Sequence, residues 1–192
     1  MKKYSGLIFI SLFAFLLSIS CVLAQTQEVK TAVNLAKADT QQIRATAQQK
    51  IEALKASIQK EKDQAKAKIK EARITGREEA LNRFDTAIAR INVLKNKVNA
   101  EIVKLDTAGV NTTTAKTYVA TAETKLVTAE SDVAQASTLL AGSTNQLSKD
   151  YKTRLQTLAQ ETQTLIVDAR QSLNDAVKSL KDAVKATKTT GK

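Results

Sequence analysis

The sequence predicts an all-α protein: an elongated antiparallel three-helix bundle or coiled coil, preceded by a long projecting N-terminal helix. Three observations predict it. The chain of 192 residues has no proline and only five glycines, so little in it can stop a helix. Aromatic residues make up only 4%, whereas a compact globular core relies on large side chains for its burial energy. Apolar residues recur every three or four positions over long stretches, which is typical of amphipathic helices.

The first 24 residues have the pattern of a secretory signal peptide. Lys2 and Lys3 form a basic start, and residues 7–17 are apolar. Small residues precede Gln25, where we expect cleavage. Two alternatives stay open: retention of the segment as a membrane anchor, and lipid attachment at Cys21, the only cysteine. The pattern predicts an exported protein that is periplasmic, extracellular or associated with the cell envelope.

Residues 25–75 predict a long amphipathic helix with a thin, alanine-rich apolar face. The phase of this face does not continue smoothly into Leu81, and Thr75 with Glu78 has the spacing of a capping box. We therefore expect a kink or a rotated face at Gly76. The helices that follow are too short to cover this segment, which predicts a stalk of ~70 Å, alone or paired with a second copy. The face consists of Val29, Val33, Ala36, Ile43, Ala47, Ile51, Leu54, Ile58, Ala65, Ile69 and Ala72.

Residues 76–186 predict an antiparallel helical bundle that begins with helices at about 77–108 and 111–141. Steps of three and four residues keep the apolar side chains of each helix on one face, and those of the second helix form a sustained heptad seam. The first set is Leu81, Phe84, Ile88, Ile91, Leu94, Val98, Ile102 and Leu105, and the second is Ala115, Val119, Ala122, Leu126, Ala129, Val133, Ala136 and Leu140.

The connection between these two helices contains signals for both helix ends. Gly109 can adopt the left-handed conformation that ends a helix. Val110 can then fold back on Leu105, and Asn111 can accept a hydrogen bond from the first turn of the next helix. Because the connection is short, we expect the two helices to be antiparallel neighbours.

A third helix is predicted at about 144–186, followed by a frayed tail at 187–192. Gly142 ends the preceding helix, and Ser143 with Gln146 has capping-box spacing. The apolar face has one polar gap, at Thr162. It consists of Leu147, Tyr151, Leu155, Leu158, Leu165, Ala169, Leu173, Val177, Leu180 and Val184.

Residues 91–133 carry a pattern of a long heptad helix, then L-D-x-x-G-V-N/D-T, then an alanine-rich heptad helix. The middle part is matched by Leu105, Asp106, Gly109, Val110, Asn111 and Thr112. The arrangement resembles a recurring helical hairpin of uncharacterised exported proteins of bacteria. The resemblance implies a helical hairpin in a secreted or envelope protein, and it carries over no activity.

The chain is basic, with a formal net charge of +11 at pH 7, and the excess lies in residues 28–76 and 147–192. For an exported protein, a basic surface favours an anionic lipid or glycan surface, and the alternative is a solvated surface without a partner. The helical seams favour a protein partner or self-association. Nucleic acid is not expected, because the densest charge run, residues 60–73, has no interleaved aromatic side chains. No small-molecule substrate is indicated.

The sequence predicts no catalytic, cofactor-binding or metal-binding residue and no cofactor. Histidine is absent, and so is cysteine beyond Cys21, which removes the commonest general base, metal ligand and thiol nucleophile. The adjacent carboxylates Glu78 and Glu79 could act as a pair. Neighbouring helix positions point about 100° apart, however, and negative charge is favoured near a helix start whatever its role.

The leading functional hypothesis is a non-enzymatic exported protein that works by contact, as a structural or interaction module of the cell envelope. One alternative is a periplasmic holdase-type chaperone, although such chaperones use a strand-rich body and no strand is predicted here. Another is an amphipathic membrane-surface or stress-protective protein, which the basic charge and the thin face of residues 26–74 favour.

Overall fold

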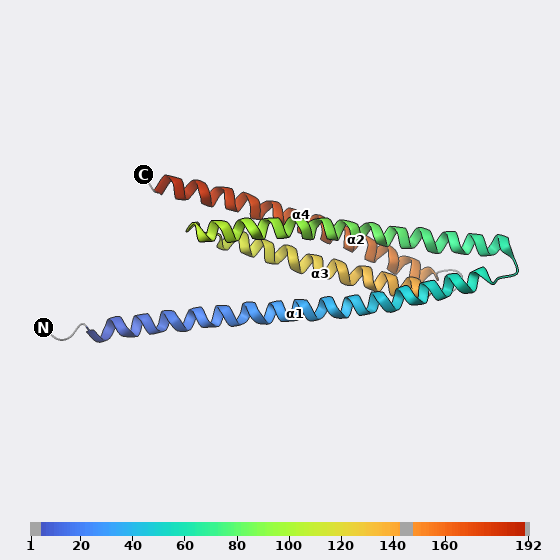
Figure 1. The fold of residues 1–192 in the computed structure, drawn as a ribbon, viewed down its shortest axis with the longest axis horizontal. Helices are drawn as coiled ribbons and strands as arrows, with labels where there is room; N and C mark the ends of the chain where they lie inside the picture. Colours follow the sequence, from blue (N-terminus) through green and yellow to red (C-terminus); the bar gives the residue numbers. More distant parts are fainter. Residues whose placement is uncertain (1–4, 143–147, 191–192) are drawn as a thin grey trace. The chain divides into compact units, whose positions relative to one another are not determined.

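The all-α prediction is confirmed by a computed structural model that describes residues 5–142 and 148–190, with side chains for 31–142 and 148–189. Four helices and no strand occur in these ranges: α1 Ser5–Gln59, α2 Gln64–Thr107, α3 Thr113–Ala141 and α4 Lys149–Thr190 (Figure 1). The chain divides into two units, residues 1–38 and 39–192. The described part of the first unit is helical from Ser5 onward. The second unit holds the bundle.

Helices α2, α3 and α4 form a helical bundle around one apolar core. All eight seam positions predicted on α3, from Ala115 to Leu140, are buried. Alanines alternate with valine or leucine along this seam, so small side chains let the neighbouring helices approach while larger ones fill the space between them. The burial predicted for this face of α3 is therefore confirmed at each position.

Contacts between the helices run in opposite directions along their sequences. Asn92 of α2 bonds to Glu130 of α3, and Lys95, three residues later, bonds to Glu123. Lower numbers on α2 thus meet higher numbers on α3, and the chain reverses between them, as Figure 1 also shows. This confirms the predicted hairpin of two antiparallel neighbours.

The turn after α2 has the predicted glycine-dependent geometry. Gly109 has φ +77°, in the left-handed region. The amide of Val110 donates to the backbone carbonyl of Leu105 at 3.0 Å, and the amide of Gly109 donates to the backbone carbonyl of Asp106 at 2.9 Å. These are the two hydrogen bonds of a Schellman motif. Val110 is buried, as the expected apolar contact requires. The two hydrogen bonds satisfy carbonyl groups at the end of α2, and the burial of Val110 keeps its apolar side chain out of water.

The start of α3 differs slightly from the prediction. Asn111 Oδ1 does accept from the amide of Thr113, at 3.1 Å. The residue that precedes the helix is Thr112, however, whose side chain is buried and donates to the Asp106 carboxylate. The helix begins at Thr113 instead of residue 111, because Thr112 is held to the preceding turn.

At the second turn, α3 ends at Ala141 as predicted, and the amide of Gly142 donates to the Thr138 carbonyl at 3.1 Å. The predicted capping box of Ser143 and Gln146 lies outside the described residues, as does Leu147. Helix α4 is described from Lys149, and Ser148 Oγ accepts from the Tyr151 amide at 3.1 Å. This bond satisfies one of the amide groups of the first turn.

The apolar face of α4 is confirmed in its middle and is continuous where a gap was predicted. Thr162 is only 1% exposed and lies in line with the apolar side chains. Leu158, Ala169, Leu173 and Leu180 are buried, Leu155, Leu165, Val177 and Val184 are half-buried, and Tyr151 is exposed.

The frayed tail predicted at 187–192 is wrong as far as Thr190. Helix α4 continues through that residue. The hydroxyls of Thr187 and Thr189 donate to the carbonyls of Ala183 and Lys185. No glycine or proline precedes Gly191 to stop the helix.

The helix start predicted at about residue 77 is wrong, and the alternative of a helix that continues through Gly76 is the one that the structure shows. Helix α1 ends at Gln59, and α2 begins at Gln64 with Asp63 as its N-cap, so Gly76 lies inside α2. A heptad that is buried except at the half-buried Leu81 continues through it: Ala67, Ile74, Leu81, Ile88, Lys95 and Ile102. The prediction had instead placed Ala65, Ile69 and Ala72 on the apolar face, and all three are exposed.

The prediction of an unaccompanied stalk is wrong for the residues of α1 in the second unit. Ala47, Ile51 and Ile58 are buried. Ile51 and Ile58 share an apolar cluster with Ile74 of α2 and Leu140 of α3. The helical conformation is interrupted at residues 60–63, so α2 turns back along this part of α1. The phase of the apolar face alone did not predict this topology.

Among the described residues, no helix has the length and apolarity required to cross a membrane.

Replacing Leu126 with lysine tests the α3 seam. Leu126 is 2% exposed, and the change removes its apolar contacts and places a charge in the core. We expect the free energy of unfolding to fall by about 3–5 kcal/mol, measured by urea denaturation followed by circular dichroism. Val103→Lys is the control, because Val103 is 65% exposed, and it should change stability by less than about 0.5 kcal/mol. Equal effects of the two changes would contradict the buried seam.

Two glycine-to-alanine substitutions should have opposite signs. Gly109→Ala places a Cβ on a residue with φ +77° and should lower the free energy of unfolding by about 1–2 kcal/mol. Gly76 lies within α2, and a Cβ there meets nothing within 4 Å. Gly76→Ala should therefore raise stability by about 0.5–1 kcal/mol. The melting temperatures of both variants, measured by thermal denaturation, test these two signs. A lower melting temperature for Gly76→Ala would mean that α2 is not continuous at that residue.

Candidate interaction surfaces

The two adjacent carboxylates considered as a possible pair are separated by the structure. Glu78 is half-buried and faces α1, where Lys55 Nζ lies 2.5 Å from its Oε2 and Gln48 Nε2 lies 3.0 Å from its Oε1. Burial alone would raise the pKa of Glu78, but the bonds from Lys55 and Gln48 outweigh it and the pKa is lowered. Glu79 is exposed on another side of the helix. Glu78 thus serves to attach α1 to α2.

Other ion pairs join the same two helices. Arg44 of α1 pairs with Asp85 of α2. A further pair joins the segment between the two helices to α2, where Lys70 Nζ lies 2.8 Å from Glu61 Oε1. Lys55 is also hydrogen-bonded to Glu78, which raises the pKa of its amine. These pairs are partly exposed, so each adds modest stability and chiefly fixes which faces meet.

A lysine occupies one position of the buried heptad of α2. Lys95 is 7% exposed, and its Nζ lies 2.7 Å from Glu123 Oε1 on α3. The sequence carries a signal of this arrangement, because Lys95 interrupts the apolar heptad between Ile88 and Ile102. A buried charge requires a partner, so Lys95 ties α2 to one place along α3.

One carboxylate of α3 is buried. Asp132 is 8% exposed, and the charge of Glu161 on α4 acts on it. Burial, and then the charge of Glu161, raises the pKa of Asp132. One heptad earlier on α3, Lys125 Nζ lies 2.7 Å from Asp168 Oδ2. Along α3, an attractive ion pair at Lys125 is thus followed one heptad later by a repulsive charge interaction at Asp132.

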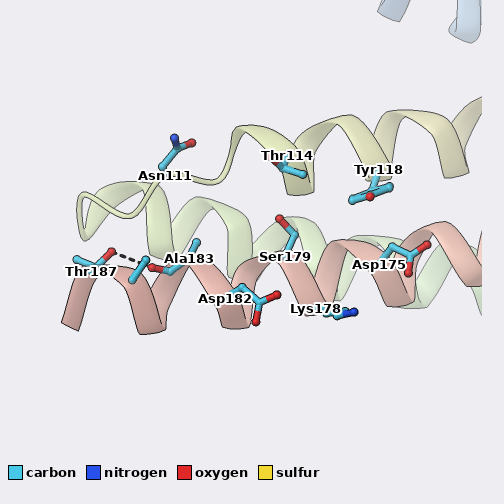
Figure 2. Close-up of a pocket in the computed structure, with 10 residues that line it drawn as sticks. Asn111, Thr114, Tyr118, Asp175, Lys178, Ser179, Asp182, Ala183 and Thr187 are labelled. Atoms are coloured by element: carbon cyan, nitrogen blue, oxygen red, sulfur yellow. Dashed lines mark hydrogen bonds between the residues drawn. The ribbon is translucent and has the colours of Figure 1, made fainter. Parts of the chain in front are cut away.

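Two grooves flank the C-terminal half of α4. The first lies between the start of α3 and the end of α4 and has a volume of about 670 Å³, and most of its lining residues are of polar types (Figure 2). Tyr118 lies along it, and Figure 2 shows Ser179 directed toward α3. Its other lining residues are Asn111, Thr114, Asp175, Lys178, Asp182, Ala183, Ala186 and Thr187.

The second groove, the α2–α4 groove, has a volume of about 560 Å³ and an apolar lining. Its apolar residues are Leu94, Val98, Leu105, Val177, Leu180 and Val184, and its charged residues are Lys97, Glu101, Lys181 and Lys185. The sequence placed the apolar members on seams, but it did not predict that the two seams leave a groove between them.

Within the described part of the chain, no group of three or more Asp, Glu, Cys or His side chains is placed to hold a metal ion. No protein-family model, curated protein or solved structure matches the chain.

Replacing Asp132 with asparagine should stabilise the protein at pH 7. The pKa of Asp132 is higher in the folded than in the unfolded chain, so its charge costs stability above the folded pKa and costs none below the unfolded value. We expect a gain of about 0.5–2 kcal/mol at pH 7. This gain should shrink as the pH falls through the raised pKa toward the ordinary value for aspartate. Urea denaturation over a pH series measures it.

Two related variants control for this result. Glu161→Gln removes the repulsion from the other side and should give a smaller gain. Asp168→Asn removes the partner of Lys125 and should lower stability by about 0.2–1 kcal/mol at pH 7. If Asp132→Asn and Asp168→Asn changed stability in the same direction, the assigned difference between the two contacts would be wrong.

Proposed function

We propose that the protein is a non-enzymatic exported helical protein that acts by contact, as a structural or interaction module of the cell envelope. In this proposal the second unit is an elongated antiparallel bundle of coiled-coil type. The observation that carries it is the α3 seam, whose eight buried positions follow a heptad repeat without interruption. Heptad packing of this kind builds long, stiff structures that present surfaces at a distance.

Export is supported by the N-terminal pattern: two lysines, an apolar run at residues 7–17 and small residues before Gln25. The chain beyond this segment contains no cysteine. In the proposal it is therefore held by packing and ion pairs, without disulfides, in the oxidising environment outside the cytoplasm.

The surface supports contact with a partner. Large apolar side chains are exposed on the bundle helices, at Val93, Val103 and Val167, with exposed fractions of 56%, 65% and 59%. The net charge is basic. A protein partner or a second copy would use the apolar positions, and an anionic lipid or glycan surface would attract the basic ones.

The proposal is tested by fractionating the native cells and measuring the intact mass of the protein, after crosslinking its exposed lysines in whole cells. We expect a species that begins at Gln25, outside the cytoplasm, together with crosslinked species of higher mass. A membrane-bound species that retains residues 1–24 or carries lipid at Cys21 would still support an envelope protein, with the N-terminus as its anchor. A cytoplasmic species with residues 1–24 intact and without crosslinked partners would overturn the proposal.

A further inference from the structure

The α2–α4 groove combines three properties that bear on what could occupy it. It is long, because its α2 side extends over residues 94–105, a rise of about 16 Å. Its lining is apolar along this length. The middle of its floor is also covered, because Val98 and Leu180 in the groove are only 4% and 5% exposed. The two helices therefore already cover most of these side chains and leave a slot.

The shape of the slot selects the kind of occupant. A helix with its side chains is about 10–12 Å across and needs a wide, exposed apolar surface. The slot suits a thin, flexible apolar chain instead. Its volume of about 560 Å³ falls in the range of small-molecule sites, which are mostly apolar with a few polar groups that orient the ligand.

The charges around the slot select the head group of the occupant. Lys97, Lys181 and Lys185 line it and form no ion pair with any described residue, whereas the one carboxylate there, Glu101, is paired with Lys104 at 3.6 Å. The rim is therefore positive. The polar groove on the other side of α4 has the opposite character, since Asp175 and Asp182 line it with Lys178 alone.

We propose that the α2–α4 groove binds a single-chain anionic amphiphile, with its alkyl chain along the apolar lining and its acidic head group at Lys97, Lys181 and Lys185. The ligand class is an alkyl carboxylate, sulfate or phosphate, taken as single molecules and not as a bilayer. This assignment goes beyond the proposed function. It depends only on α2 and α4, and it stands whether or not residues 1–24 are removed.

The test uses the full chain and sodium dodecanoate, below the concentration at which it forms micelles. Titration is followed by calorimetry and by methyl NMR of leucine and valine. We expect saturable binding of one dodecanoate that shifts the methyl signals of Leu94, Val98 and Leu180. Because each buried methylene contributes similarly, affinity should rise about tenfold from octanoate to decanoate and again to dodecanoate. Dodecyltrimethylammonium has the same chain and the opposite charge, and it should bind at least about tenfold more weakly.

Matched variants place the binding in the groove. Val184→Glu puts a negative charge at the half-buried edge of the groove and should weaken dodecanoate binding about tenfold or more. Val167→Glu makes the same change at an exposed position of α4 outside it and should have no effect. Lys97→Gln, Lys181→Gln and Lys185→Gln together should weaken binding about tenfold at low salt. The triple variant Lys62→Gln, Lys68→Gln and Lys149→Gln controls for net charge. Circular dichroism verifies that each variant is folded.

Several outcomes would overturn the assignment. Equal loss in the two valine variants would mean that binding is elsewhere, for instance at the apolar residues 7–17. Equal binding of dodecyltrimethylammonium would remove the requirement for an anion. Groove methyl signals that change with protein concentration in the absence of dodecanoate would show that a second copy covers the groove. A vesicle-binding measurement with anionic lipid tests whether the protein binds a bilayer instead of single amphiphile molecules. Adsorption to bilayers that is unaffected by Val184→Glu would be unrelated to the groove.

Discussion

The burial of the α3 seam is the constraint on which the bundle depends. Helix α3 contacts both α2 and α4 in the shared core, and its alternation of alanine with valine or leucine sets how closely each neighbour can approach. The chain has few aromatic residues, so its core stability comes from many small contacts in register instead of from a few large side chains. Helices α2 and α4 both pack on α3 in this core and also contact each other, so the seam of α3 positions all three helices.

The parts of the fold that could be predicted are those where one apolar face is unambiguous. The α3 seam and the Gly109 turn were predicted because glycine and a strict heptad have few alternative interpretations. The start of α2 was not predicted, because alanines and isoleucines lie on several faces there. Ile69 and Ile74 suit two different seams, and only the contacts of Ile74 with α1 select one. Gly76 does not end a helix for a related reason. One glycine weakens a helix by about 1 kcal/mol, and packing can offset that loss of stability.

The candidate surfaces were less predictable than the fold, since each depends on two helices at once. Lys95 and Asp132 could be seen at or near the seams in the sequence, but whether each meets an opposite or a like charge depends on which residue lies across the interface. Thr162 looked like a gap and is fully buried. The α2–α4 groove exists because two half-buried faces meet imperfectly, which no single-helix pattern encodes.

The buried Lys95 has a consequence for alignment along the bundle axis. An apolar seam that repeats every seven residues fits its neighbour almost as well after sliding by one repeat, about 10 Å. Lys95 has no counterpart one repeat away, where Ile88 and Ile102 stand. Sliding by one repeat in one direction would place Lys116 opposite its ammonium group and leave it buried without a carboxylate, at a cost of several kcal/mol. Sliding in the other direction would bring Glu130 opposite Lys95, so this side chain opposes slippage of the repetitive apolar core in one direction only.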